Sequence, residues 1–485
     1  MKTATDLGEA SVTTTSVGRV ERGKVKKLFE HLREEIHKQR LKPGDKLPAS
    51  RHLSKQLGIS RNGVTTAFDM LAAEGLVTGR IGAGTFVSGD AGAHSGDRSE
   101  SETTTKLFSN WAQNLPLKPH ILPCLAVKID FRPGRPNRLG LEASLTPMRR
   151  AIGRLSRLDF AGPDANDPAG RLRLRNLMAN HLRITRGLAC EPSDILLTSG
   201  THQSLDLIAR LFTGNAATIS VEDPCYPLVP KLFQSNGYSI SPTAVDDEGI
   251  VVSQIDPDAR LIYVTPNHQF PLGYRLSAKR RIALLNLAAV GNAFVVEDDY
   301  DGELYSAGNY RTCLKADDQK DRVIYLGSLS KYLFPQLRLG FIVAPKVLRD
   351  TLVRAHWLTD RQVSLPVQLC LESLLENGDF IKIVRRSERD YQTRTALLCR
   401  LINDRLSSHF TVSGRSHGFQ VTALAVSGFD VKSYVHSALS RGVGIYSLTE
   451  FALDTKRIGL VFGLADLSED EITEGVDILR SLLPF

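Results

Sequence analysis

Lys331 has neighbours that are suited to covalent chemistry. The hydroxyls of Ser328 and Ser330 precede it, and Arg338 follows seven residues later. A primary amine can form a Schiff base with an aldehyde, while hydroxyls and a guanidinium can hold a phosphate group. These residue types at this spacing predict a Schiff base between Lys331 and pyridoxal 5'-phosphate (PLP).

Other parts of such a site occur at the ends of apolar runs. Asp298 ends the run 294–297 and could pair with the protonated pyridine nitrogen, while Tyr300 could reach the ring hydroxyl. Tyr226 could stack on the ring. A helix N-terminus favours a phosphate, and the turn predicted to open such a helix consists of Ser199, Gly200 and Thr201. Each of these residues could instead be a helix cap or a core residue, but their recurrence at successive strand ends favours one shared site.

The elements that must position these residues alternate between strands and helices. Amphipathic stretches such as 204–212 and 279–289 separate apolar runs. This alternation predicts an α/β fold with a mainly parallel sheet, in which ligands bind outside the carboxyl ends of the strands. A smaller α+β domain is expected from about residue 350. The apolar runs lie at 195–197, 218–221, 261–264, 293–296, 323–326 and 341–343.

The N-terminal part has a different pattern. Leucine and isoleucine recur every four residues between 28 and 36, which indicates one apolar face of a helix. Ser50 is expected to cap a second helix, and Ser60 a third, with Gly58 in the turn between them. Two helices joined in this way form a helix-turn-helix. The glycine-rich segment 76–87 predicts a wing.

Positive charge is concentrated in this N-terminal unit. Residues 19–90 contain 14 Lys and Arg against 8 Asp and Glu, in a chain of net charge +8. A basic helix-turn-helix predicts operator DNA as the partner. At the start of the recognition helix, Arg61 could contact guanine and Asn62 adenine. The other predicted DNA contacts, each of which could instead be a solvated surface residue, are Arg51, Ser60, Thr65, Arg80 and Gly82.

Length and composition set the domain organisation. We expect a flexible arm at 1–18, a winged helix-turn-helix at 19–88, a linker at 89–124 and a body at 125–485, with its smaller subdomain at about 350–485. The six cysteines contain no CxxC pair, so neither a metal site nor a disulfide framework is indicated. No apolar run approaches the ~18 residues of a membrane span. A cytoplasmic protein without a membrane partner is expected.

The chain resembles a known family. Its N-terminal unit is similar to the GntR winged helix, and its body resembles a fold-type I, class I aminotransferase; the MocR/GabR subfamily fuses the two. The motifs that carry this resemblance lie at 41–51, 82–87, 265–271, 297–301 and around Lys331. The resemblance implies PLP held as an internal aldimine at Lys331, Asn267 among the cofactor-binding residues, a head-to-tail homodimer and transcriptional regulation.

Four positions depart from the family pattern. Ala165 stands where a tyrosine usually reaches the phosphate of the neighbouring subunit, which predicts looser cofactor binding. Arg171 and Leu272 replace the usual Tyr and Thr, and Gly63 replaces a Thr in the recognition helix. These departures call full transaminase competence into question.

We therefore expect a PLP-dependent transcriptional regulator that senses an amine or amino-acid-like effector through aldimine exchange at Lys331. Transaminase activity would be residual or weak. Arg457 stands where aminotransferases bind the substrate carboxylate and is the candidate effector ligand, although it could be a surface or core-capping arginine. The alternative hypothesis is an active PLP-dependent aminotransferase that carries a DNA-binding head.

Overall fold

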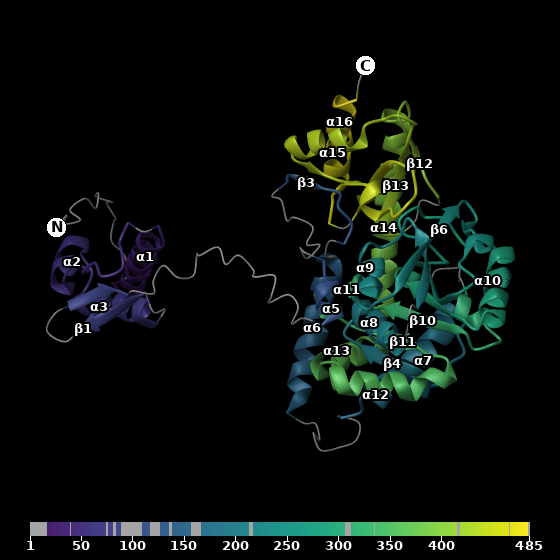
Figure 1. Ribbon diagram of the computed structural model, residues 1–485, viewed down its shortest axis with the longest axis horizontal. Coiled ribbons are helices and arrows are strands. Elements are labelled where there is room, and N and C mark those ends of the chain that lie inside the picture. Colours follow the sequence, from purple (N-terminus) through teal and green to yellow (C-terminus); the bar gives the residue numbers. More distant parts are fainter. Residues whose placement is uncertain are drawn as a thin grey trace. The chain divides into compact units, whose positions relative to one another are not determined.

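In a computed structural model, the protein forms two compact units, Met1–Leu107 and Phe108–Phe485 (Figure 1). No helix among its described residues is long and apolar enough to cross a membrane. The structure describes residues 17–38, 40–73, 76–80, 84–88, 109–116, 127–134, 138–156, 166–212, 217–305, 312–333, 335–414, 418–464 and 466–483.

The first unit is a three-helix bundle with a two-stranded wing. Its elements are α1 (Val17–His37), α2 (Ser50–Leu57), α3 (Arg61–Ala73), β1 (Val77–Arg80) and β2 (Gly84–Val87). The wing strands are antiparallel, and the core includes the fully buried Val64 and Leu71 of α3.

The predicted N-cap is confirmed for α3 but not for α2. Ser60 caps α3 as expected, because the Gly63 N–H donates to Ser60 Oγ at 3.1 Å. The expectation for α2 was wrong by one residue. Ala49 is its N-cap and Ser50 is already helical, so no side chain caps this helix.

The centre of the second unit is an eight-stranded sheet of order β4-β11-β10-β9-β8-β5-β6-β7. The pairs from β10 through β9, β8 and β5 to β6 are parallel, which confirms the predicted mainly parallel sheet. β11 is antiparallel to both neighbours. The strands are β4 (Ile195–Thr198), β5 (Thr218–Asp223), β6 (Ser239–Asp246), β7 (Gly249–Ile250), β8 (Ala259–Val264), β9 (Phe294–Asp299), β10 (Val323–Ser328) and β11 (Gly340–Val343).

Helices cover both faces of this sheet (Figure 1). One face packs against α8 (Thr201–Leu211), α9 (Leu228–Ser235) and α12 (Arg349–Thr359). The other packs against α7 (Leu172–Arg186), α10 (Ala278–Val290), α13 (Leu365–Glu376) and α14 (Asp379–Arg405). Alternate residues of each strand enter the two cores, as Leu196 and Leu197 of β4 do.

Three elements of the second unit come before α7 in the chain. The segment expected to be a linker contains a short helix, α5 (Asn110–Gln113), beside α9, where Ser235 Oγ donates to the Asn114 carbonyl at 3.2 Å. β3 (Ile129–Asp130) and α6 (Arg138–Leu155) follow. β3 pairs in parallel with β14 (Val443–Gly444), so the start of this unit joins its C-terminal part.

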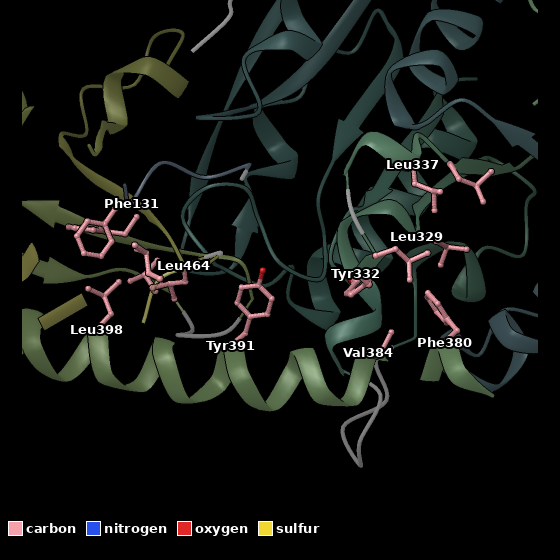
Figure 2. Packing of buried hydrophobic residues seen from close by; sticks show 14 of the residues in the cluster. Phe131, Leu329, Tyr332, Leu337, Phe380, Val384, Tyr391, Leu398 and Leu464 are labelled. Atoms are coloured by element: carbon pink, nitrogen blue, oxygen red, sulfur yellow. The ribbon is translucent and has the colours of Figure 1, made fainter. Parts of the chain in front are cut away.

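The C-terminal part is built on a second sheet of order β12-β13-β16-β15. Its elements are β12 (Phe410–Val412), β13 (Gln420–Ala425), α15 (Val431–Ser440), β15 (Tyr446–Ser447), β16 (Gly459–Gly463) and α16 (Glu469–Ser481). The helix α14 connects it to the large sheet. Figure 2 shows side chains of α14, among them Tyr391 and Phe380, pointing into one apolar cluster that also contains Phe131 and Tyr332.

The separate cores predict separate unfolding. Replacing Leu71 by Ala removes a fully buried side chain of the first unit and should destabilise that unit by about 2–5 kcal/mol. Differential scanning calorimetry should show one transition lowered and the other unchanged. The matched control on the same helix is Met70→Ala, because Met70 is 39% exposed. A shift of both transitions by Leu71→Ala would contradict independent unfolding.

Candidate functional site

The carboxyl ends of the parallel strands bring the predicted residues together. The register pairs Leu326 of β10 with Asp298 of β9. Ser328 ends β10 and pairs with Gly340, whose Cα lies against the backbone of Gly200 and Thr201: a Cβ at Gly340 would lie 2.9 Å from Gly200 Cα. The ends of β9, β10 and the turn after β4 therefore meet, as the sequence predicted.

An anion-binding cradle lies at the N-terminus of α8. Gly200 has φ of +93° and precedes the helix, and a Cβ there would lie 3.2 Å from Arg338 Cζ. The positive φ favours glycine, and a side chain here would also press on the guanidinium that approaches the first turn of the helix. The helix amides and the guanidinium both favour a phosphate at this point. The site therefore fits the phosphate end of PLP.

Ser199 forms hydrogen bonds within the protein that the sequence did not indicate. Its Oγ donates to Asp360 Oδ2 at 3.1 Å, and its N–H donates to Gln203 Oε1 at 2.6 Å. Gln203 Nε2 also donates to Asp360, at 2.7 Å. In this arrangement the Ser199 hydroxyl fixes the turn before α8 to α12, because Asp360 ends that helix.

The charges of Asp298 and Arg338 both act on Tyr226. Burial raises the pKa of Tyr226, the Asp298 carboxylate adds to the rise, and the Arg338 guanidinium opposes it. Asp298 is 7% exposed, and Tyr263 O–H donates to its Oδ2 at 2.8 Å. An anion, an aromatic ring and a cation are the residue types that suit the pyridinium, the ring and the phosphate of PLP.

Two further aromatic rings pack against Tyr226. The ring centroid of Tyr226 lies 5.8 Å from that of His202 and 5.9 Å from that of Phe270, both edge to face. Burial and the Arg338 charge lower the pKa of His202, which favours its neutral form. Phe270 also packs edge to face on Tyr300, with centroids 5.7 Å apart.

Tyr300 and Asn267 are both buried and hydrogen-bonded within the protein. Gln420 Nε2 donates to the Tyr300 hydroxyl at 2.5 Å, and His268 Nδ1 lies 2.9 Å from the same oxygen. Asn267 Nδ2 donates to Asp299 Oδ1 at 3.4 Å.

A buried ion cluster lies beneath the end of β9 and was not foreseen from the sequence. Arg186 Nε lies 2.9 Å from Asp299 Oδ2, and its Nη2 lies 3.6 Å from Glu303 Oε1. Burial alone would lower the pKa of Arg186, but Glu303 and Asp299 raise it above its ordinary value. Burial would likewise raise the pKa of Glu303, but His181 and Arg186 lower it to about 2. The cluster stays charged and fixes the segment after β9.

Glu222 is a second buried carboxylate that sequence reasoning missed. Its Oε2 accepts from the Thr265 hydroxyl at 2.6 Å and from the Thr265 N–H at 3.1 Å. Burial raises its pKa to about 7, against the hydrogen bonds from Thr265 and Gln269, and the nearby Asp298 adds to the rise. The two acidic residues that end β5 were the feature of the sequence that could have indicated it.

Lys331 lies on a short helix at the end of β10. This helix, α11 (Ser330–Leu333), is fixed by Tyr332, whose hydroxyl accepts the Glu303 N–H at 3.0 Å. The side chains of Ser330, Lys331 and Arg80 lie outside the described residues, as do Gly82 and Ala165.

Arg457 contacts residues other than those that surround Tyr226. Its Cζ lies 5.9 Å from the ring centroid of Tyr274, and it helps to lower the pKa of Asp246, which is set mainly by Arg280. Its Nη1 is buried and has no hydrogen-bond partner among the described residues. A carboxylate would satisfy this nitrogen.

The loop before Arg457 is attached to the end of β5. The carboxylate of Asp223 accepts the N–H groups of Leu453, Asp454 and Thr455 at 2.7–2.9 Å. The Cys225 N–H donates to the Phe451 carbonyl at 3.0 Å. The strand end that leads to Tyr226 and the loop that leads to Arg457 therefore form one hydrogen-bonded unit.

The first unit presents its predicted residues to solvent. The side chains of Arg61 and Asn62 are exposed in the first turn of α3, and Arg51 is exposed in the first turn of α2. Thr65 Oγ1 donates to the Arg61 carbonyl at 3.0 Å, so this hydroxyl bonds within its own helix. Ser60 is exposed and caps α3.

Three of the departures from the family pattern have local explanations. Arg171 is buried and its Nε donates to Glu372 Oε2 at 3.0 Å. Leu272 is fully buried in the cluster that includes Tyr446. A Cβ at Gly63 would lie 2.8 Å from Ile59 Cγ2, so a threonine would not fit without a shift.

Comparison with known proteins covers both units. Residues 24–87 match the family described as bacterial regulatory proteins, gntR family. The chain is 32% identical over 467 residues to the HTH-type transcriptional regulator YdeL of Bacillus subtilis (strain 168), which covers 94% of this chain and 95% of that protein. It is 30% identical over 460 residues to the probable rhizopine catabolism regulatory protein MocR of Rhizobium meliloti, at 94% and 93% coverage.

The second unit is similar to solved aminotransferases. The crystal structure of Pyrococcus horikoshii kynurenine aminotransferase, in complex with PMP, matches with a TM-score of 0.69 and 25% identity. The match covers 79% of this chain and 98% of that one. An aminotransferase fold thus follows a regulator's DNA-binding head.

Glu222 predicts a specific pH dependence of stability. Its folded-state pKa of about 7 exceeds its ordinary value of 4.5, so the folded state binds this proton more tightly than the unfolded state. Stability should therefore fall by up to about 3 kcal/mol as the pH rises from about 4.5 to 7. Glu222→Gln should remove this part of the fall in thermal unfolding experiments. The exposed Glu450→Gln is the control, and an unchanged pH profile in Glu222→Gln would refute the assignment.

Proposed function

The chain belongs to the MocR-type regulators of the GntR family, DNA-binding transcriptional regulators with an aminotransferase-like domain, and we propose that it binds PLP and responds to a small amine or amino acid. The observation that carries this proposal is the arrangement around Tyr226. The charges of Asp298 and of the Arg338 guanidinium both act on Tyr226, and this guanidinium lies close to Gly200 at the start of α8.

Each part of this arrangement has a task toward the cofactor. Asp298, held by Tyr263, would pair with the pyridinium nitrogen, and Tyr226 would support the ring. The amides at the start of α8, Arg338 and Ser328 would bind the phosphate, together with Ser330. Bound PLP supplies an aldehyde that condenses with a primary amine, either that of Lys331 or that of an effector.

Arg457 would bind the carboxylate of an amino-acid effector. Its Nη1 is buried without a partner among the described residues, and a carboxylate would supply the missing acceptor. The tie between Asp223 and the loop before Arg457 would then link effector binding to the strand end that leads to Tyr226. An effector can shift the equilibrium between two conformations of the protein only if it binds one conformation more tightly than the other.

The DNA-binding unit would read a specific operator in the cytoplasm. Arg61 and Asn62, exposed at the start of α3, are placed for base contacts, and Arg51 for phosphate contacts. A head-to-tail homodimer would present two such units, and a dimer binds two half-sites.

An active aminotransferase that carries a DNA-binding head is the second candidate function. The likeness to a kynurenine aminotransferase at 25% identity favours it, since the same fold and cofactor would serve both functions. Lys331 would then also act as the general base for proton transfer. Rapid turnover of several amino donors with a keto acid would favour the enzyme, whereas slow or absent turnover would favour the regulator.

The first test concerns the cofactor. Purified protein reconstituted with PLP should have the visible absorption band of a Schiff base, which Lys331→Ala should lack, because Lys331 is the proposed site of this Schiff base. Screening small amines and amino acids against the wild-type band should find compounds that shift it. Lys320→Ala, which removes an exposed lysine of the same unit, is the control. The absence of a band in the reconstituted wild type would contradict PLP binding.

The second test concerns DNA. Arg61→Ala should weaken binding to the cognate operator by about 1–3 kcal/mol, and binding to random DNA much less, because a base contact discriminates between sequences. Fluorescence anisotropy at fixed salt concentration measures both affinities. Arg33→Ala removes an exposed charge from α1 of the same unit and serves as the control. Equal losses on both DNAs in Arg61→Ala would make Arg61 a phosphate contact.

A further inference from the structure

A histidine lies in the first turn of α8, where the proposed phosphate cradle is. His202 is the second residue of this helix and follows Gly200 by two residues. Its ring packs edge to face on Tyr226, with ring centroids 5.8 Å apart, and its Nε2 lies 3.4 Å from the Tyr226 hydroxyl oxygen. The first turn of a helix also carries the free amides that favour an anion. His202 therefore lies beside both the ring support and the cradle.

A permanent positive charge is present at the same turn. The Arg338 guanidinium comes so close to Gly200 that a Cβ there would lie 3.2 Å from Arg338 Cζ. An arginine side chain does not lose its proton in a protein. A second positive charge, on the imidazole of His202, is therefore repelled by this guanidinium unless an anion lies between or beside them.

The surroundings keep His202 neutral in the absence of an anion. Burial lowers the pKa of His202, and the charge of Arg338 lowers it further. The hydroxyl of Tyr226 gives no compensating negative charge, because burial and the charge of Asp298 raise its pKa above the ordinary value of 10.0. Near pH 7, a neutral imidazole thus faces a neutral phenol.

The acidic group on the neighbouring helix is bound to other side chains. Asp360, which follows α12, accepts hydrogen bonds from Ser199 at 3.1 Å and from Gln203 at 2.7 Å. The side chain of Lys331 lies outside the described residues. Of the charged groups that the structure describes, Arg338 is the one that acts on the imidazole.

A phosphate group would reverse this electrostatic balance. It carries about 1.5 to 2 negative charges near pH 7. Bound at the start of α8, it would offset the charge of Arg338 and would itself attract an imidazolium, since a nearby opposite charge favours the charged form of a titratable group. The pKa of His202 would then rise, and the ring would bind a proton that it does not hold otherwise.

We propose that His202 takes up one proton from the solvent when a phosphate group binds at the start of α8, and that its imidazolium then provides a second positive charge beside Arg338. This inference rests on the proposed function, because PLP supplies the phosphate. It makes cofactor affinity depend on pH. The affinity rises as the pH falls through the interval between the pKa of His202 with phosphate and the lower pKa without it.

The test measures the binding of pyridoxine 5'-phosphate, an analogue of PLP whose alcohol cannot form a Schiff base, to the full-length protein freed of PLP. Between pH 8 and pH 6, the wild-type affinity should gain about five- to tenfold relative to His202→Gln, because a pKa shift of one unit changes an affinity about tenfold. Glutamine can still form a hydrogen bond with Tyr226 but has no titratable group. His436→Gln, which replaces an exposed histidine of the same unit, is the matched control and should behave as the wild type does.

Two further measurements follow the proton itself. Calorimetry in two buffers of different ionisation enthalpy should show, at pH 6.5, that the wild type takes up about half a proton more per bound ligand than His202→Gln does. In NMR spectra of protein with ¹³C-labelled histidine, the signal that is missing from His202→Gln identifies His202. Its titration midpoint should rise by about one pH unit or more when pyridoxine 5'-phosphate is bound.

The outcomes separate this inference from the function on which it rests. If neither PLP nor pyridoxine 5'-phosphate binds to the wild type, the proposed cofactor is wrong. If both bind, but the pH dependence and the proton uptake are the same in the wild type and in His202→Gln, the role of His202 alone is refuted. A midpoint of His202 that the ligand leaves unchanged or lowers would also overturn it. His202→Asn provides the same comparison if His202→Gln does not fold.

Discussion

The candidate site depends on one buried charge, the Arg186 guanidinium. Removing such a charge from water is costly unless acceptors surround it, and Asp299 and Glu303 supply them. Because successive strand residues point to opposite faces of a sheet, fixing Asp299 on one face commits Asp298 to the other. Tyr325 O–H donates to Asp299 at 2.7 Å and ties β10 to the same point. The ion pair between Arg186 and Asp299 thereby also fixes the face of β9 on which Asp298 lies.

The apolar core imposes a second constraint, on Lys331. Leu329, Tyr332 and Leu333 belong to the same cluster as residues of α14 and of the C-terminal sheet, and Figure 2 shows Leu329 and Tyr332 together with Phe380 and Val384 of α14. The backbone of Lys331 is therefore held on both sides by well-packed residues. Close packing on both sides leaves the backbone at this position little freedom to move.

The strand-end rule made much of the site predictable from the sequence. Asp298, Tyr226 and the turn at Gly200 follow apolar runs, and parallel strands end at one edge, so their convergence was foreseeable. The partners of these residues were not. Arg186 ends a helix whose pattern signals only amphipathicity, and the contact of Gln420 with Tyr300 joins residues far apart in the chain. The antiparallel direction of β11 could not be predicted either, because the apolar sequence of a fully buried strand does not indicate whether the strand pairs in parallel or antiparallel. The hydrogen bond between Ser199 and Asp360 was not foreseen, because Asp360 is equally remote in the sequence.

The attachment of three successive amides to Asp223 has a consequence for how such a protein can evolve. The loop 453–455 must keep its length and its extended course to present all three N–H groups to one carboxylate. New effectors are most easily accommodated by changing loops, and here the nearest loop is tied to the strand end that leads to Tyr226. Insertions in this loop would therefore also disturb the end of β5. We therefore expect related proteins to differ at this site by replacement of single side chains and to keep the length of this loop.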